Sequence, residues 1–250
     1  MKQIPDTGDS RLRGMCAFCG RQPSTRDHIP PKVFLDKPLP DNVAVVPSCL
    51  RCNRSSSVDE QYLACLIDCV LAGNVELAKA QSNRVANAID RSPKFETLLR
   101  KAHRSEDGVD IHDFDAERVN RVLVKLARGH VAFEINELWL WPPHRVSYAP
   151  LHQISDPALT IFEDGSSTSS SNEPEVISGW PEVGSRAMFR IVEGQDILPG
   201  GWINVQQNRY RYRVSDNVVS IVIAEYLAVE VEWQSEDTEL ETNDGQEHRA

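Results

Sequence analysis

The alternation of hydrophobic and polar positions divides the chain into a helical first part and a strand-rich second part. In the first part, apolar residues recur three and four positions apart, as on one face of a helix. After about residue 140 the pattern changes to short β-branched and aromatic runs separated by Gly, Pro, Asp and Asn, which is typical of an antiparallel sheet. This order of elements predicts an α+β fold.

Three helical stretches are predicted between residues 57 and 129. The first begins with Ser57 as N-cap, has Glu60 three positions later as in a capping box, and stops at Gly73. The second lies within VELAKAQSNRVANAID, residues 75–90. The third spans about residues 115–128, where apolar positions repeat at three and four and Gly129 closes the run.

Short strands are predicted in the second part, within RAMFRIV, GWINV, RYRYRV, NVVSIVI and LAVEVEW. The last alternates apolar and acidic residues, so we expect one buried and one wet face. In RYRYRV the arginines take every second position, and two interpretations remain open. They form a ladder that grips phosphates, or they pair with Glu230 and Glu232 on a neighbouring strand, which is the favoured interpretation.

Composition divides the chain into four regions. The first region, residues 1–60, contains a segment from Cys16 to about Ser57 with too few large apolar residues for a core of its own, so this segment needs a staple such as a metal. Residues 61–135 are predicted to be helical, and residues 136–234 β-rich with a flexible loop near 164–174. Residues 235–250 are acidic and predicted to be disordered. Without a membrane span or a secretory signal, a cytoplasmic protein with no membrane partner is expected.

The formal net charge of −10 argues against a uniformly basic nucleic-acid-binding surface, but the charge is unevenly distributed. Between residues 16 and 57 the basic residues outnumber the acidic ones. The basic residues there are Arg21, Arg26, Lys32, Lys37, Arg51 and Arg54. Any contact with nucleic acid is therefore expected near this end of the chain.

Two Cys-x-x-Cys pairs, Cys16 with Cys19 and Cys49 with Cys52, lie about thirty residues apart. In a reducing compartment such pairs indicate metal rather than disulfides, and four thiolates make a closed structural zinc site. A redox role would need only one such pair, usually in a βαβ setting. The other two cysteines, Cys65 and Cys69, are expected to be buried free thiols on one helix.

Polar residues with possible chemistry lie between the two pairs. Asp27 and His28 are adjacent in STRDHI, which is expected to be extended because Ile29 precedes Pro30. VAVVP, residues 43–47, is the predicted second strand. A helix or turn should begin near Cys49, which places Asn53 at its start.

The segments CAFC, RDHIPP, DNVAVVPSC and CNRS, in that order within residues 16–59, resemble the HNH nucleases with their ββα-metal finger. The resemblance covers roughly a sixth of the chain. It implies that His28 is the general base that activates water. It further implies that Asp27 and Asn53 hold one divalent cation, Mg²⁺ or Mn²⁺, and that Asn42 fixes the loop and the orientation of His28.

Two features depart from this resemblance. The loop after Asp27 and His28, often glycine-rich in the family, is the stiffer PPKVFLDKPLP. A lysine that often follows the last metal ligand is replaced by RSSS. Phosphate contacts are then expected from Lys32, Arg51 and Arg54, with Arg26 beside the site.

The favoured hypothesis is a metal-dependent endonuclease that acts on DNA; a role in restriction or phage defence follows from the resemblance alone. The first alternative is a zinc module that binds nucleic acid or a protein without cutting. The second is a regulatory protein whose partner, or a second copy of the chain, binds the C-terminal β-rich region. The presence of Asp27 and His28 followed by Asn53 favours the endonuclease hypothesis, because a purely structural zinc finger needs none of these three residues.

Overall fold

The computed structural model describes residues 12–40, 43–106, 109–164, 197–198, 201–215 and 217–234, with the backbone alone for 103–112 and 197–198. Helices and strands mix in three antiparallel sheets. Two of these are hairpins, formed by β1 (Thr25–Ile29) with β2 (Ala44–Ser48), and by β3 (His103–Glu106) with β4 (Val109–His112). The short 3₁₀ turns are η1 (Leu12–Gly14), η2 (Lys32–Phe34) and η3 (Leu151–Gln153).

The third sheet has six strands in the order β5-β10-β9-β8-β7-β6. Its strands are β5 (Arg145–Pro150), β6 (Ile197–Leu198), β7 (Trp202–Gln206), β8 (Tyr210–Val214), β9 (Val218–Ile223) and β10 (Leu227–Glu232). Strands β7 to β10 form a meander, and β5 pairs with β10 at the far edge. The predicted antiparallel C-terminal sheet is therefore confirmed. RAMFRIV, the loop near 164–174 and the acidic tail lie outside the described residues.

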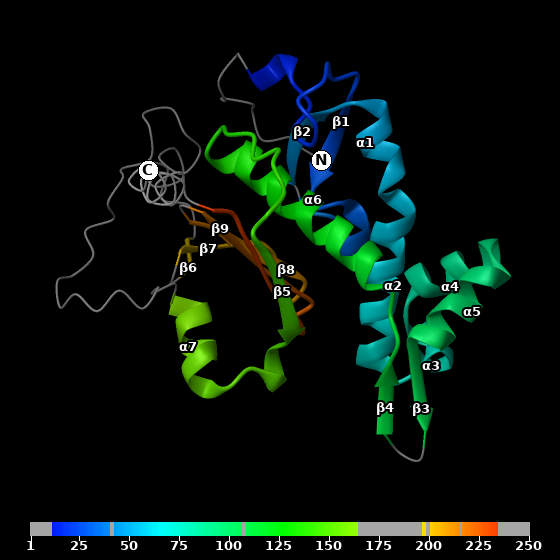
Figure 1. The fold of residues 1–250 in the computed structure, drawn as a ribbon. Coiled ribbons are helices and arrows are strands. Elements are labelled where there is room, and N and C mark those ends of the chain that lie inside the picture. The colour runs from blue at the N-terminus through cyan, green and yellow to red at the C-terminus, as the bar shows by residue number, and fades with distance from the viewer. Residues whose placement is uncertain are drawn as a thin grey trace, which may run out of the picture.

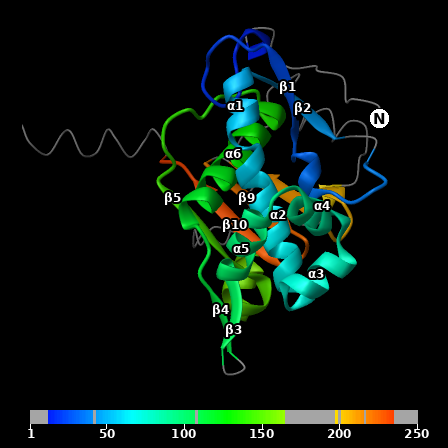
Figure 2. The same cartoon turned by 90° about the vertical axis from the view of Figure 1, so that its right-hand side faces the viewer.

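Seven helices are described. They are α1 (Leu50–Ser55), α2 (Ser57–Ala72), α3 (Val75–Gln81), α4 (Asn83–Arg91), α5 (Pro93–Ala102), α6 (Ala116–Glu134) and α7 (Asp156–Asp164). Helix α6 lies at the centre, with α2 beside it, the β1–β2 hairpin at one end and the large sheet behind (Figures 1 and 2). No described helix has the length and apolar character needed to cross a bilayer.

The first two predicted helices are found with changed ends. Helix α2 stops at Gly73, whose φ of 90° suits a residue without a side chain. It starts one residue earlier than expected, because Ser56 rather than Ser57 is the N-cap. Glu60 forms an ion pair with Lys125 of α6. The stretch 75–90 is split into α3 and α4, because Ser82 leaves the helix and its side chain accepts a hydrogen bond from the N–H of Val85 as the N-cap of α4.

The prediction that Gly129 ends the third helix is wrong, since α6 continues through it to Glu134. This glycine instead permits close packing against β1. A Cβ atom added at Gly129 would lie 2.5 Å from Cδ1 of Ile29. The absence of a side chain there lets the helix backbone rest on the strand.

The arginines of RYRYRV are held in ion pairs and hydrogen bonds, as the favoured interpretation states, but with other partners. Arg209 pairs with Asp36 and Asp68, and Arg211 with Glu163 and Glu225. Glu232 instead pairs with Arg145. The reason is the strand order, which places β9 between β8 and β10.

One large core joins regions that lie far apart in the sequence. It contains Phe34 and Val43 near the β1–β2 hairpin, apolar residues of α2 to α6, and the inner face of the large sheet. A smaller core of Phe18, Ile29 and Phe133 with their neighbours lies under the hairpin, against α6. The hairpin is thus seated on the central helix by apolar contacts.

Candidate active site

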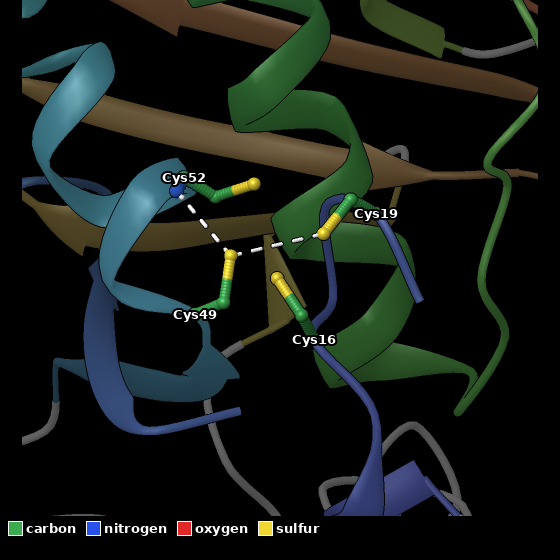
Figure 3. Close-up of side chains that lie close together, drawn as sticks. All are labelled: Cys16, Cys19, Cys49 and Cys52. Atoms are coloured by element: carbon green, nitrogen blue, oxygen red, sulfur yellow. Dashed lines mark hydrogen bonds between the residues drawn. The ribbon is translucent and has the colours of Figure 1, made fainter. Parts of the chain in front are cut away.

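The four cysteines of the two Cys-x-x-Cys pairs form a group able to hold a metal ion such as zinc. Their sulfur atoms all lie within 4.8 Å of one another, and those of Cys19 and Cys49 are 3.8 Å apart (Figure 3). Tetrahedral ligands about 2.3 Å from a zinc ion are themselves about 3.8 Å apart. The spacing of these free thiols therefore fits a closed zinc site.

Local structure explains how the thiols converge. Cys16 opens a tight turn in which the N–H of Gly20 donates to its carbonyl, and Gly20 takes a positive φ of 70°. The N–H of Ala17 donates to the carbonyl of Pro47, which ties this turn to β2. The second pair lies where β2 ends and α1 begins.

Cys49 is the N-cap of α1, and its sulfur accepts a hydrogen bond from the N–H of Cys52. This hydrogen bond favours the thiolate and lowers the pKa of Cys49 to about 7. A cysteine in that state is readily deprotonated, as a metal ligand must be.

Strand β1 carries Asp27 and His28 into one pocket. The pocket has a volume of about 350 Å³ and is lined by Asp27, His28, Pro31, Lys32, Val33, Ser57, Val58, Glu60 and Gln61. Asp27 is buried at 8% exposure, whereas His28 is half-buried. Although neighbours on a strand point to opposite faces, both residues border this pocket, which opens between β1, the η2 loop and the start of α2.

Asp27 is part of a buried charge cluster. The ammonium of Lys125, from α6, lies 2.6 Å from Oδ2 of Asp27 and 2.6 Å from Oε1 of Glu60. It donates a hydrogen bond to Glu60, while its approach to Asp27 is an ion pair without hydrogen-bond geometry. Lys125 also lies 5.0 Å from the centre of the Phe18 ring, a cation–π contact beside the cysteine turn.

The surroundings of His28 favour its neutral form. Burial lowers the pKa of His28, the positive charge of Lys32 lowers it further, and Asp27 acts in the opposite direction. The imidazole is therefore mostly unprotonated near neutral pH and able to accept a proton.

Asn53 fixes α1 to β1. Its Nδ2 donates to the carbonyl of Arg26, 3.1 Å away, and lies 3.2 Å from Oγ1 of Thr25. A carbonyl only accepts hydrogen bonds, so the amide nitrogen must face it. Asn53 does not line the pocket that holds Asp27 and His28. Its role as a cation ligand stays a prediction, and Asn42 lies outside the described residues.

The four basic residues expected to contact phosphate are all exposed and belong to neighbouring elements. Arg26 lies on β1, Lys32 on η2, and Arg51 and Arg54 on α1. Lys32 lines the pocket itself. Nucleic-acid contact by these residues stays a prediction.

Sequence reasoning missed Lys125 and Glu60. Glu60 stood at a capping-box position, which already explained it, and Lys125 lay in a helix that was interpreted from its apolar positions alone. One signal was present, because Lys125 falls three residues after the apolar position Val122 and so shares its helix face. Its partner Asp27, however, is almost a hundred residues away in the sequence.

The chain was compared with protein-family models, with curated proteins and with solved structures, and none of them matches it.

Proposed function

We propose that this chain is a metal-dependent nuclease that hydrolyses phosphodiester bonds in DNA, with His28 as the general base. The observation that carries the proposal is the pairing of a half-buried His28, whose pKa is lowered, with a buried carboxylate in one open pocket. Perturbed titratable groups in a pocket are typical of a catalytic site. The resemblance to the HNH finger supplies the reaction class.

In this proposal the neutral imidazole of His28 takes a proton from a water molecule. The resulting hydroxide attacks phosphorus, the bond from phosphorus to the leaving oxygen breaks, and that oxygen takes a proton from solvent. A divalent cation in the pocket would supply charge neutralisation to the phosphate. Lys32 and the other exposed basic residues hold the phosphate backbone.

The cysteine cluster has a structural part in this scheme. Four thiolates leave no open coordination position, so a zinc ion there would not activate water. It would join the cysteine turn to the start of α1, and α1 is hydrogen-bonded to β1 through Asn53. The strand that carries Asp27 and His28 would thereby be held in place.

The test is cleavage of supercoiled plasmid by zinc-loaded protein with Mg²⁺ or Mn²⁺, with an EDTA control. We expect nicking that His28→Ala reduces at least a hundredfold, the lower end of what general-base catalysis contributes. The matched control is His144→Ala, which removes an exposed imidazole elsewhere. Retained cutting by a folded His28→Ala protein would contradict the proposal.

A second candidate is a zinc module that binds nucleic acid without cutting. One observation favours it: Lys125 already neutralises one carboxylate of the pocket. Binding of this kind would weaken steeply with added salt and would not change when Mg²⁺ is removed. Plasmid that stays intact while the protein shifts its mobility would favour this candidate.

A further inference from the structure

Apolar side chains form part of the lining of the pocket that contains Asp27 and His28. Pro31 and Val33 come from the loop around η2, and Val58 comes from the first turn of α2. Val58 is 57% exposed, the highest value for a large hydrophobic residue in the described part of the chain. A phosphate group is charged and is bound by basic or polar groups. The apolar lining therefore indicates that the pocket holds more of the substrate than its phosphate.

Two polar side chains of α2 lie beside Val58 in the same lining. Ser57 supplies a hydroxyl and Gln61 a carboxamide, and Gln61 shares a helix face with Val58 because the two are three positions apart. No hydrogen bond to this carboxamide occurs within the described part of the chain. Its oxygen acceptor and its two N–H donors are therefore available to a ligand. A glutamine carboxamide can bind the edge of a nucleobase through a donor and an acceptor at once.

The size and the mixed lining of the pocket suit a small flat group. Its volume of about 350 Å³ lies near the lower end of the range for ligand pockets, about 300–1,000 Å³. A nucleobase has two apolar faces and a polar edge, so a site for it needs both apolar side chains and hydrogen-bonding groups. Lys32 is exposed and belongs to the same lining, where its ammonium can contact the phosphate attached to such a base.

We propose that this pocket is a subsite for one unpaired nucleobase next to the phosphate that is cut, so that the preferred substrate is single-stranded or locally unpaired DNA. The reaction itself rests on the proposed function, and the subsite adds the form of the substrate. In a duplex each base is paired and stacked, and it can enter a pocket only after it has been flipped out, at a cost in free energy. A base in a single strand enters at a smaller cost.

The first test measures binding without cutting, by fluorescence anisotropy with the zinc-loaded full chain and no Mg²⁺ or Mn²⁺. The probes are a labelled single-stranded oligonucleotide, the same strand in a duplex, and the same strand made abasic, which keeps the phosphates and lacks the bases. We expect the intact single strand to bind at least tenfold more tightly than either of the others. An abasic strand that binds as tightly as the intact one overturns the proposal, because the protein would then recognise phosphates alone.

Two variants locate the base in this pocket. Gln61→Ala and Val58→Ser should each weaken binding of the single strand at least threefold and leave binding of the duplex unchanged. The matched controls are Gln81→Ala and Leu77→Ser on α3, which remove an exposed carboxamide and an exposed apolar side chain elsewhere and should change neither affinity. Single-strand affinity that is unchanged in both pocket variants overturns the proposal, and so does an equal loss for single strand and duplex.

Cleavage with Mg²⁺ or Mn²⁺ separates the base subsite from the nuclease activity. The kcat/KM should be at least tenfold higher for the single strand than for the duplex, and a duplex with a short unpaired bubble should be cut within the bubble. Equal cutting of the single strand and the duplex overturns the subsite and retains the nuclease. Tighter binding of the single strand that depends on Gln61, with no cutting of any DNA, retains the subsite and rejects the nuclease.

Discussion

The chemistry of single side chains in this molecule is decided by what surrounds them, and His28 is the clearest case. Burial and Lys32 both lower its pKa, whereas Asp27 raises it less. A cation bound at Asp27 would lower the pKa of His28 further, because it repels the protonated imidazole. The direction of the shift is therefore the same with and without metal.

This direction predicts the pH profile of cleavage. The kcat/KM of cleavage, which reports ionisations of the free protein, should rise with pH through a pKa below 6.5 and then level off, since the neutral imidazole is the active form. Below 6.5 the folded state binds fewer protons than the unfolded state, so the free energy of unfolding should rise with pH in the same window.

Lys32→Met removes one of the two causes that lower the pKa of His28, the other being burial. The pKa should therefore rise, and the acidic limb of the pH profile should move to higher pH. The matched control is Lys37→Met, which removes an exposed charge that does not line the pocket. The kcat/KM of cleavage measured from pH 5 to 8 checks both variants. A limb that stays in place in Lys32→Met would show that Lys32 does not act on His28.

The surroundings of the cysteines shift their pKa values in opposite directions, down for Cys49 and up for Cys65 and Cys69. Cys65 and Cys69 on α2 are fully buried, and burial raises the pKa of each thiol to about 12. Their prediction as buried free thiols is confirmed. A thiol with such a pKa is protonated and unreactive at pH 8.

Titration with a disulfide reagent should therefore separate Cys49 from Cys65 and Cys69. In the zinc-loaded protein none of these three should react quickly, and chelation should make Cys49 reactive, because its pKa is lowered to about 7. Cys65 and Cys69 should react only in denaturant. Rapid modification of Cys65 or Cys69 in folded protein, located by mass spectrometry, would contradict this assignment.

At the scale of elements, the contact between α6 and β1 is the one on which the candidate site depends. Gly129 lets the helix backbone approach Ile29, and Lys125, one turn earlier, reaches Asp27 on the same strand. Helix and strand are thus joined by the close contact between the backbone at Gly129 and the side chain of Ile29, and by the ion pair between Lys125 and Asp27.

Gly129→Ala should destabilise the protein by about 1–3 kcal/mol, the usual cost of overpacking. The added Cβ would lie 2.5 Å and 2.7 Å from two carbons of Ile29. Gly14→Ala is the matched control, because its Cβ would meet nothing within 4 Å. Urea unfolding checks both variants, and Ile29→Ala should remove most of the difference. Equal stability of the two glycine variants would refute the close contact.

Periodicity predicted most elements but not their junctions. The end of α2 at Gly73 and the strands from Trp202 onward follow from local patterns. The continuation of α6 through Gly129 does not, because a glycine that ends a helix and one that permits close packing look alike in sequence. Glu60 was likewise interpreted by its local position, although its partner lies on another helix.

At the scale of the molecule, Asp68 joins three regions. Its carboxylate pairs with Arg84 of α4 and with Arg209 next to β8, and both arginines also contact Asp36 after η2. Asp68 is 10% exposed, and the two arginines are 14% and 16% exposed. No pattern within any one region predicts such a cluster, since each member has a distant partner.

Asp68→Asn should lower the free energy of unfolding by about 3 kcal/mol, because two nearly buried guanidinium groups lose a partner. Asp90→Asn is the matched control: Asp90 is 67% exposed and its pair with Lys79 is worth about 0.5 kcal/mol or less. Denaturant unfolding followed by circular dichroism measures both. Similar losses in the two variants would mean that Asp68 does not join these regions.

Helix α6 touches the hairpin and the large sheet from neighbouring positions. Gly129 rests on Ile29, and the next residue, His130, lies 2.8 Å from the hydroxyl of Tyr210 on β8 and stacks on Tyr212. Inserting one residue between Gly129 and His130 would rotate everything beyond it by about 100°. Helix α6 therefore cannot gain or lose a single residue at this point without detaching either the candidate site or the sheet.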